Sequence, residues 1–269
     1  MRTQELAPAK IKIGRAHVCD VITVEEGGTG FTLLTGEAFS LPADKVSMEQ
    51  RAAEAFFAAL GVPVPPLTVR LEKNIPAFAG LGGGSADVAA LLRCLRQQYA
   101  PEMAVEQLRA IGLTVGSDMP FCVSGGTALA EGRGERLTAL PGLPDCWVLL
   151  CKPDFGIPTP ALFARADGGQ PKHRPDIDGM VRALEAGSLE GAASRLCNVF
   201  EELLPEEYHE VFRIKEQLLK LGALNAAMSG SGPTVFGIFR EEAAAQKAAD
   251  AMKRRYSQTY LAKLVGKLV

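Results

Sequence analysis

The spacing of hydrophobic positions changes several times along the chain, and each change predicts an element. Residues 20–41 alternate short β-rich stretches with glycine turns, which predicts a β-hairpin with strands at Val21–Val24 and Phe31–Leu34. From Ser47 the apolar residues recur at helical spacing as far as Leu60, and Gly61 then ends the helix. Residues 67–73 alternate apolar and polar side chains, as a half-buried strand does.

The rest of the chain mixes both periods without any internal repeat. Helical spacing predicts helices at residues 86–99, 105–111, 177–186, 189–195, 208–221 and 241–256, and β-rich runs predict strands at residues 127–130, 147–151, 235–239 and 259–264. With 269 residues, the chain suits two modest lobes better than one minimal core.

A glycine-rich loop, Gly80–Ser85, follows the strand at residues 67–73 and precedes a helix. Successive glycines let backbone N–H groups converge on an anion, and the helix adds the positive end of its dipole, so the loop can hold phosphate. Ser85 is the expected N-cap. The loop lacks the Lys-Ser/Thr ending of a P-loop and fits the dinucleotide fingerprint poorly. A flexible turn is the alternative.

A second loop of small residues, Met228–Thr234, lies far downstream between a helix and a buried strand. Taken alone it would be a tight turn. Two such loops in one chain favour a joint site, so we expect the second loop to pack beside the first and complete the phosphate site.

Phosphoryl transfer needs positioning, charge neutralisation and a base for the attacking hydroxyl. Lys10, among small apolar neighbours, and Asp118 are the candidates. Pro120 disfavours helix for the residue before it, which places Asp118 on a helix-to-strand turn. The alternatives are an exposed lysine before a first strand and a turn aspartate that bonds nearby backbone N–H groups.

Composition narrows the function classes. The chain is 47% hydrophobic and 22% charged with a net charge of −2, as in an ordinary soluble protein without a broad basic surface for nucleic acid. No stretch is long and apolar enough for a spanning helix, so we expect a cytoplasmic protein. The six cysteines form no C-x-x-C pair and the three histidines lie far apart, so we expect reduced, buried thiols and no zinc site.

Three segments, Ala7–Ile11, Pro76–Ala86 and Met228–Thr234, resemble in order and spacing the three motifs of the GHMP small-molecule kinases. Residues 116–121, 131–135 and 156–160, with Phe163, are similar to the branch of that superfamily that phosphorylates a cytidyl diphosphate alcohol. The resemblance covers nearly the whole chain from Asp20 onward. It implies a two-lobed α+β fold, with an N-terminal lobe (residues 1–153) like domain 2 of ribosomal protein S5 and a ferredoxin-like C-terminal lobe (residues 154–269).

The resemblance also implies the roles of individual residues. Asp118 would accept the proton of the substrate hydroxyl, and Lys10 would keep that carboxylate ionised and stabilise the alkoxide. Thr159 and Phe163 would hold the alcohol, with Phe163 stacked on the cytosine, and Ser85 would help bind Mg²⁺. A monomer or homodimer is expected. The residues expected to bind ATP are Pro76, Ala77, Phe78, Ala79, Gly80, Leu81, Gly82, Gly83, Gly84, Ser85, Ala86, Ser229, Gly230, Ser231 and Gly232.

The sequence departs from the family after Ile11. Lys12 replaces an asparagine, and the chain then passes through residues 13–20 directly to the predicted hairpin, so a family block with an Asp-Gly-Tyr-His segment that recognises cytosine is missing. Residues 12–18 read like one frame of a sequencing adapter, which makes an assembly chimera the alternative to a real deletion. Besides the leading interpretation, another GHMP kinase and a nucleotide-binding form without activity stay open.

Overall fold

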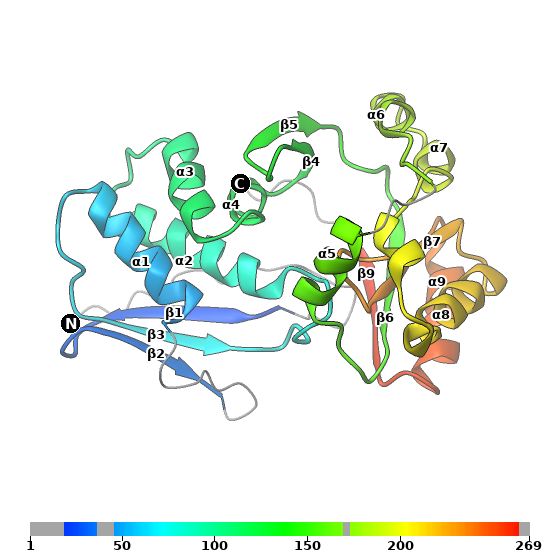
Figure 1. The fold of residues 1–269 in the computed structure, drawn as a ribbon, viewed down its shortest axis with the longest axis horizontal. Coiled ribbons are helices and arrows are strands. Elements are labelled where there is room, and N and C mark those ends of the chain that lie inside the picture. The colour runs from blue at the N-terminus through cyan, green and yellow to red at the C-terminus, as the bar shows by residue number, and fades with distance from the viewer. Residues whose placement is uncertain (1–18, 37–45, 169–172, 264–269) are drawn as a thin grey trace.

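The structure is a computed structural model that describes residues 19–36, 46–168 and 173–263. Its elements form two sheet-based layers joined by a β-hairpin (Figure 1). The first half of the chain supplies a sheet in the order β1-β3-β2 and the helices above it, and the second half supplies a sheet in the order β7-β8-β6-β9.

β3 (Leu67–Glu72) is the central strand of the first sheet. β1 (Val21–Glu26) runs antiparallel to β3, and β2 (Phe31–Thr35) runs parallel to it on the other side. The predicted strands are therefore present, but the predicted hairpin between them is wrong. β3 buries Leu67, Val69 and Leu71 and lies between the other two strands, which it separates.

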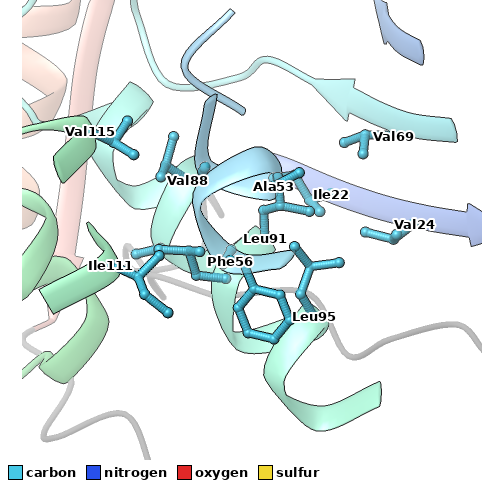
Figure 2. Close-up of a cluster of buried hydrophobic side chains, with 14 of the residues drawn as sticks. Ile22, Val24, Ala53, Phe56, Val69, Val88, Leu91, Leu95, Ile111 and Val115 are labelled. Atoms are coloured by element: carbon cyan, nitrogen blue, oxygen red, sulfur yellow. The ribbon is translucent and has the colours of Figure 1, made fainter. Parts of the chain in front are cut away.

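Helices cover one face of this sheet. α1 (Met48–Ala59) begins after the N-cap Ser47, whose hydroxyl accepts a hydrogen bond from the Gln50 N–H at 3.0 Å, and ends before Gly61 as predicted. The other helices of this layer are α2 (Gly83–Tyr99), α3 (Val105–Val115) and the short α4 (Met119–Ser124). Figure 2 shows the core that results: Phe56 of α1 and Leu91 and Leu95 of α2 meet Ile22 and Val24 of β1.

An antiparallel hairpin, β4 (Thr127–Glu131) and β5 (Arg136–Leu140), leads from this layer toward the second sheet. β6 (Trp147–Lys152), β7 (Asn225–Met228), β8 (Val235–Phe239) and β9 (Gln258–Lys263) form that second, antiparallel sheet. In chain order its strands lie 2-3-1-4, which is the order of a ferredoxin-like βαββαβ unit.

α8 (Glu210–Lys220) and α9 (Glu242–Lys253) cover one face of the second sheet and share a core with it (Figure 1). Between β6 and α8 lie α5 (Thr159–Gly168), α6 (Ile177–Glu185), α7 (Leu189–Ala193) and the 3₁₀ turns η1 (Val199–Leu203) and η2 (Glu206–Tyr208). All six cysteines are free thiols, but the expectation that they are buried holds only for Cys146 and Cys151, since the others are half-buried or, for Cys197, exposed. In the part of the chain that the structure describes, no helix has the length and apolar character to cross a membrane.

The opposite face of the second sheet packs against the segment that carries the glycine loop. Ile75 and Leu81 lie in one apolar cluster with Val148 of β6 and Ala262 of β9. The loop is therefore held between the first layer of helices and the second sheet. The division at residue 153 stays a prediction, and because β6 pairs with β8 and β9, a boundary before Trp147 is favoured.

Candidate active site

The glycine loop joins the end of β3 to α2. Gly82, at φ +66°, is the N-cap of this helix, and the Ala86 N–H makes the first helical hydrogen bond, to the Gly82 carbonyl at 2.9 Å. The prediction of Ser85 as the N-cap is therefore wrong. The left-handed conformation at the helix entry favours glycine, so the helix begins earlier and Ser85 lies within its first turn. The N–H groups of Gly83, Gly84 and Ser85 are thus first-turn donors without an intrahelical partner, the kind of backbone groups that can bind an anion.

The second glycine loop, residues 228–234 between β7 and β8, lies directly against the first. The Ser229 hydroxyl donates to the Gly80 carbonyl at 2.8 Å, and the Thr234 N–H donates to the Ala79 carbonyl at 3.3 Å. A Cβ atom at Gly80 would lie 2.2 Å from the Ser229 carbonyl oxygen, so the approach requires glycine. The expected packing of the two loops is confirmed.

Asp118 lies at the N-cap position of α4, not on a helix-to-strand turn. The sequence does not predict this helix because Pro120 disfavours helix for the residue before it, but proline is tolerated in a first turn, where Pro120 lies. The Asp118 side chain is exposed and makes no capping hydrogen bond. The alternative, a turn aspartate that bonds nearby backbone N–H groups, is therefore wrong. A carboxylate that caps nothing remains available to an incoming hydroxyl.

The turn of the β4–β5 hairpin supports the segment before Asp118. Gly134, at φ +105°, approaches so closely that a Cβ atom there would lie 2.4 Å from the Ser117 carbonyl oxygen. The Glu135 carboxylate accepts a hydrogen bond from the Arg133 N–H at 2.6 Å and shapes the turn. This explains the two glycines of residues 131–135 by their backbone conformation and close approach.

Lys10, the second member of the expected catalytic pair, lies outside the described residues, as does the departure from the family after Ile11. Its pairing with Asp118 stays a prediction.

The two residues expected to hold the alcohol lie on α5. Thr159 Oγ1 is 2.7 Å from Ser231 Oγ, which ties the start of α5 to the second glycine loop. Phe163, 54% exposed, meets the ring of Phe200 edge to face at 5.1 Å between centroids. One edge contact leaves an aromatic face open to a ligand. Phe78, at φ +51° and 75% exposed, lies against Gly156 before this helix.

A buried charge cluster beneath the glycine loop was missed by sequence reasoning. Lys73 donates to Asp87 at 2.6 Å and also to Asp20, and these carboxylates are 4% and 7% exposed, respectively. The second oxygen of Asp20 accepts hydrogen bonds from the N–H groups of Asn74 (2.6 Å) and Ile75 (2.8 Å). The cluster therefore fixes the chain between β3 and the loop.

The charges of this cluster do not balance. Burial raises the pKa of Asp87 to about 7 even though Lys73 opposes the shift. Burial lowers the pKa of Lys73, but its hydrogen bonds to Asp20 and Asp87 outweigh that effect and place it above the ordinary value. One ammonium faces two carboxylates, so Asp87 takes up a proton near neutral pH. These residues are distant in sequence and look like ordinary surface charges, so no sequence signal marks them.

A cavity of about 650 Å³ lies between β4–β5 and α6–α7, lined mainly by apolar side chains such as Leu140, Met180 and Leu184. It includes no residue of either glycine loop and not Asp118, so it is not the phosphate site. Within residues 19–36, 46–168 and 173–263, no group of three or more His, Cys, Asp or Glu side chains is placed to hold a metal ion.

The site and the two lobes match the family of small-molecule kinases that the motifs resemble. The family model "GHMP kinases N terminal domain" matches residues 47–126, and "GHMP kinases C terminal" matches residues 180–258. A crystal structure of homoserine kinase from Cytophaga hutchinsonii shares the fold with a TM-score of 0.75 at 19% identity, covering 95% of this chain and 88% of that one. The expected α+β GHMP kinase fold is confirmed.

Nearer relatives are kinases of one kind. The 4-diphosphocytidyl-2-C-methyl-D-erythritol kinase of Levilactobacillus brevis is 40% identical over 82% of this chain and 77% of its own length. The kinase of the same name from Caldicellulosiruptor bescii is 37% identical over 87% of this chain and 82% of its own length. A crystal structure of 4-(cytidine 5'-diphospho)-2C-methyl-D-erythritol kinase superposes with a TM-score of 0.74 at 29% identity, covering 93% of this chain and 87% of that one. The chain belongs to the 4-diphosphocytidyl-2-C-methyl-D-erythritol kinase family of GHMP kinases, which are ATP-dependent small-molecule kinases.

Proposed function

We propose that this chain transfers the γ-phosphoryl group of ATP to the 2-hydroxyl of 4-diphosphocytidyl-2-C-methyl-D-erythritol, a step of non-mevalonate isoprenoid precursor synthesis. The substrate comes from the names of the relatives. The observation that carries the proposal for this chain is the contact of the two glycine loops at Gly80 and Ser229, which brings a phosphate-binding helix start and a second small-residue loop together.

Phosphoryl transfer through a loose transition state depends on positioning and on charge stabilisation. In the proposed site the N–H groups of Gly83, Gly84 and Ser85 bind the phosphates. Asp118, which caps nothing, accepts the proton of the 2-hydroxyl, and Lys10 keeps Asp118 ionised. Thr159 and Phe163 orient the cytidyl alcohol.

The bound Mg²⁺ would neutralise charge on the ATP oxygens. Mg²⁺ is commonly held by few protein groups together with substrate phosphates, and the Ser85 hydroxyl, in the first turn of α2, fits that role. Asp87 is engaged with Lys73 and is a poorer candidate. We infer that the protein works in the cytoplasm, where ATP is available, as a monomer or homodimer.

The test is an ADP-release assay with 4-diphosphocytidyl-2-C-methyl-D-erythritol, run on this chain and on the same chain with a family-type segment restored after Ile11. Turnover of this alcohol, in preference to mevalonate, homoserine or a sugar, supports the proposal. Preference for one of those others identifies a different GHMP kinase. ATP binding by calorimetry without ADP release on any alcohol, with or without the restored segment, identifies a nucleotide-binding protein and contradicts the proposal.

A further inference from the structure

Asn198, the residue before η1, binds the second glycine loop with both ends of its amide. Its Nδ2 donates to the carbonyls of Met228 and Gly230, both at 2.8 Å, and its Oδ1 accepts a hydrogen bond from the Phe200 N–H at 3.0 Å. The contact to Phe200 fixes which end of the amide faces the loop. No motif of the sequence includes this residue.

Glu201 holds the same loop from the same turn. One carboxylate oxygen accepts the Met228 N–H at 2.7 Å, and the other is 2.5 Å from the Lys215 ammonium on α8. The peptide groups on both sides of Met228 are therefore fixed by two side chains of η1 and its N-cap. The direction of the backbone at the start of the second glycine loop is therefore fixed.

The bond to Gly230 also orients the next N–H group. In a trans peptide the C=O and the following N–H point in opposite directions, so a Gly230 carbonyl aimed at Asn198 directs the Ser231 N–H away from it. Gly230, at φ +52°, is conformationally permissive and would allow this peptide to rotate. Asn198 removes that freedom.

Two other backbone donors of the loop are used internally. The Ser229 N–H donates to the Thr234 carbonyl and the Gly232 N–H donates to the Ser229 carbonyl, both at 2.8 Å. Among the described residues no protein acceptor meets the Ser231 N–H. This donor lies in the loop that contacts Gly80, beside the start of α2, and a phosphate oxygen is the acceptor that suits it.

We propose that Asn198, supported by Glu201, is a positioning residue that fixes the Gly230–Ser231 peptide so that the Ser231 N–H faces a phosphate of ATP. The proposal rests on the ATP site proposed above. Without Asn198 the peptide rotates, and either the donor is lost or a carbonyl oxygen faces the anion. Loss of Asn198 should therefore weaken the binding of the ATP phosphates and leave the binding of the nucleoside unchanged.

The experiment compares ATP binding by calorimetry with adenosine binding by ligand-observed NMR, on the full chain. Asn198→Asp removes the two donors and places an oxygen against the loop carbonyls. The control is Asn225→Asp: Asn225 also donates to a carbonyl, that of Ala193 at 2.8 Å, and accepts from a backbone N–H, but outside the glycine loops. We expect ATP affinity to fall at least tenfold in Asn198→Asp, with adenosine affinity unchanged, and both to be kept in Asn225→Asp.

Asn198→Ser, which replaces the two amide donors by one hydroxyl on a shorter side chain and adds no charge, answers the same question if Asn198→Asp does not fold. Wild-type ATP affinity in these variants overturns the inference and leaves the proposed function standing. An equal loss of ATP and adenosine affinity, or a fall in melting temperature far beyond that of Asn225→Asp, shows that Asn198 is only structural and also overturns it. If the unaltered chain binds no ATP, the proposed function fails and the inference fails with it.

Discussion

Replacement of Gly80 by alanine tests the contact between the two glycine loops. Gly80 has φ +70°, where an alanine costs about 1–2 kcal/mol. Its Cβ would lie 2.2 Å from the Ser229 carbonyl oxygen, and real Cβ atoms do not approach closer than 3.0 Å, so the loops must separate by about 0.8 Å. That shift weakens the Ser229–Gly80 hydrogen bond, worth about 1 kcal/mol. We expect a loss of about 2–4 kcal/mol of unfolding free energy.

The same displacement should affect catalysis. A misplacement of about 1 Å in a catalytic site can cost on the order of 100-fold in rate, so kcat/KM for ATP should fall by about that factor in Gly80→Ala. Gly61→Ala is the matched control: Gly61, at the end of α1, has φ +72°, but a Cβ atom there would have no neighbour within 4 Å. It carries the conformational cost without the clash.

The assays are urea unfolding for stability and ADP release, or ATP calorimetry, for the site. We expect Gly80→Ala to lose at least about 1 kcal/mol more than Gly61→Ala, since the hydrogen bond and the clash concern Gly80 alone. Equal losses in the two variants, together with unchanged ATP affinity in Gly80→Ala, would show that the loops do not touch at this point. The phosphate site would then have to be built without the second loop.

Three further predictions concern side chains. Asp118→Asn should lower kcat by about 10²–10⁴-fold with ATP affinity unchanged, by ADP release and calorimetry; near-full turnover would remove its role as base. Phe163→Ala should raise KM for the cytidyl alcohol by about tenfold or more, as the loss of one stacked base implies, and leave KM for ATP alone; equal changes in both would contradict the stacking. Because the pKa of Asp87 is raised to about 7 in the folded chain, protonation stabilises that state, and this stability is lost as pH rises from about 4 through 7. Urea unfolding should therefore show wild type gaining stability relative to Asp87→Asn as pH falls through that window, and Asp178→Asn, an exposed control, should track wild type.

The elements that the sequence predicts well are those with local signals. The helix after Ser47 has its cap, its apolar stripe and a terminating glycine within one short segment, and α1 follows that prediction. The strands at Val21–Glu26 and Phe31–Thr35 also follow their alternation, but their pairing does not. Strand pairing depends on which strand occupies the centre of the sheet. That strand is β3, which comes later in the chain than β1 and β2.

The same distinction applies to the site. The glycine loops are recognisable in the sequence because their backbone conformation restricts the residue type. Their contact could be predicted because two such loops in one chain favour a joint site. The supports of these loops could not be found this way. Asp20 bonds Lys73 across 53 residues and Asn198 bonds the second loop across 30, and neither residue type is unusual for a surface. Only the fold shows that Asp20 faces backbone groups just before the first loop and that Asn198 faces backbone groups of the second.

The two sides of the site differ in how they depend on the segment after Ile11. In the proposed site, the phosphate side consists of backbone groups of Gly80–Ser85 and of the second loop, and contacts among the described residues hold both loops. The proposed alcohol side relies on side chains from separate segments: Lys10, Asp118, Thr159 and Phe163. By the family resemblance, a missing block after Ile11 would remove part of the cytosine site, whereas the described contacts of the two loops come from other segments of the chain. We therefore expect restoration of the block to improve the affinity for the cytidyl alcohol far more than the affinity for ATP, and an equal gain in both would show that the phosphate side also depends on the N-terminal segment.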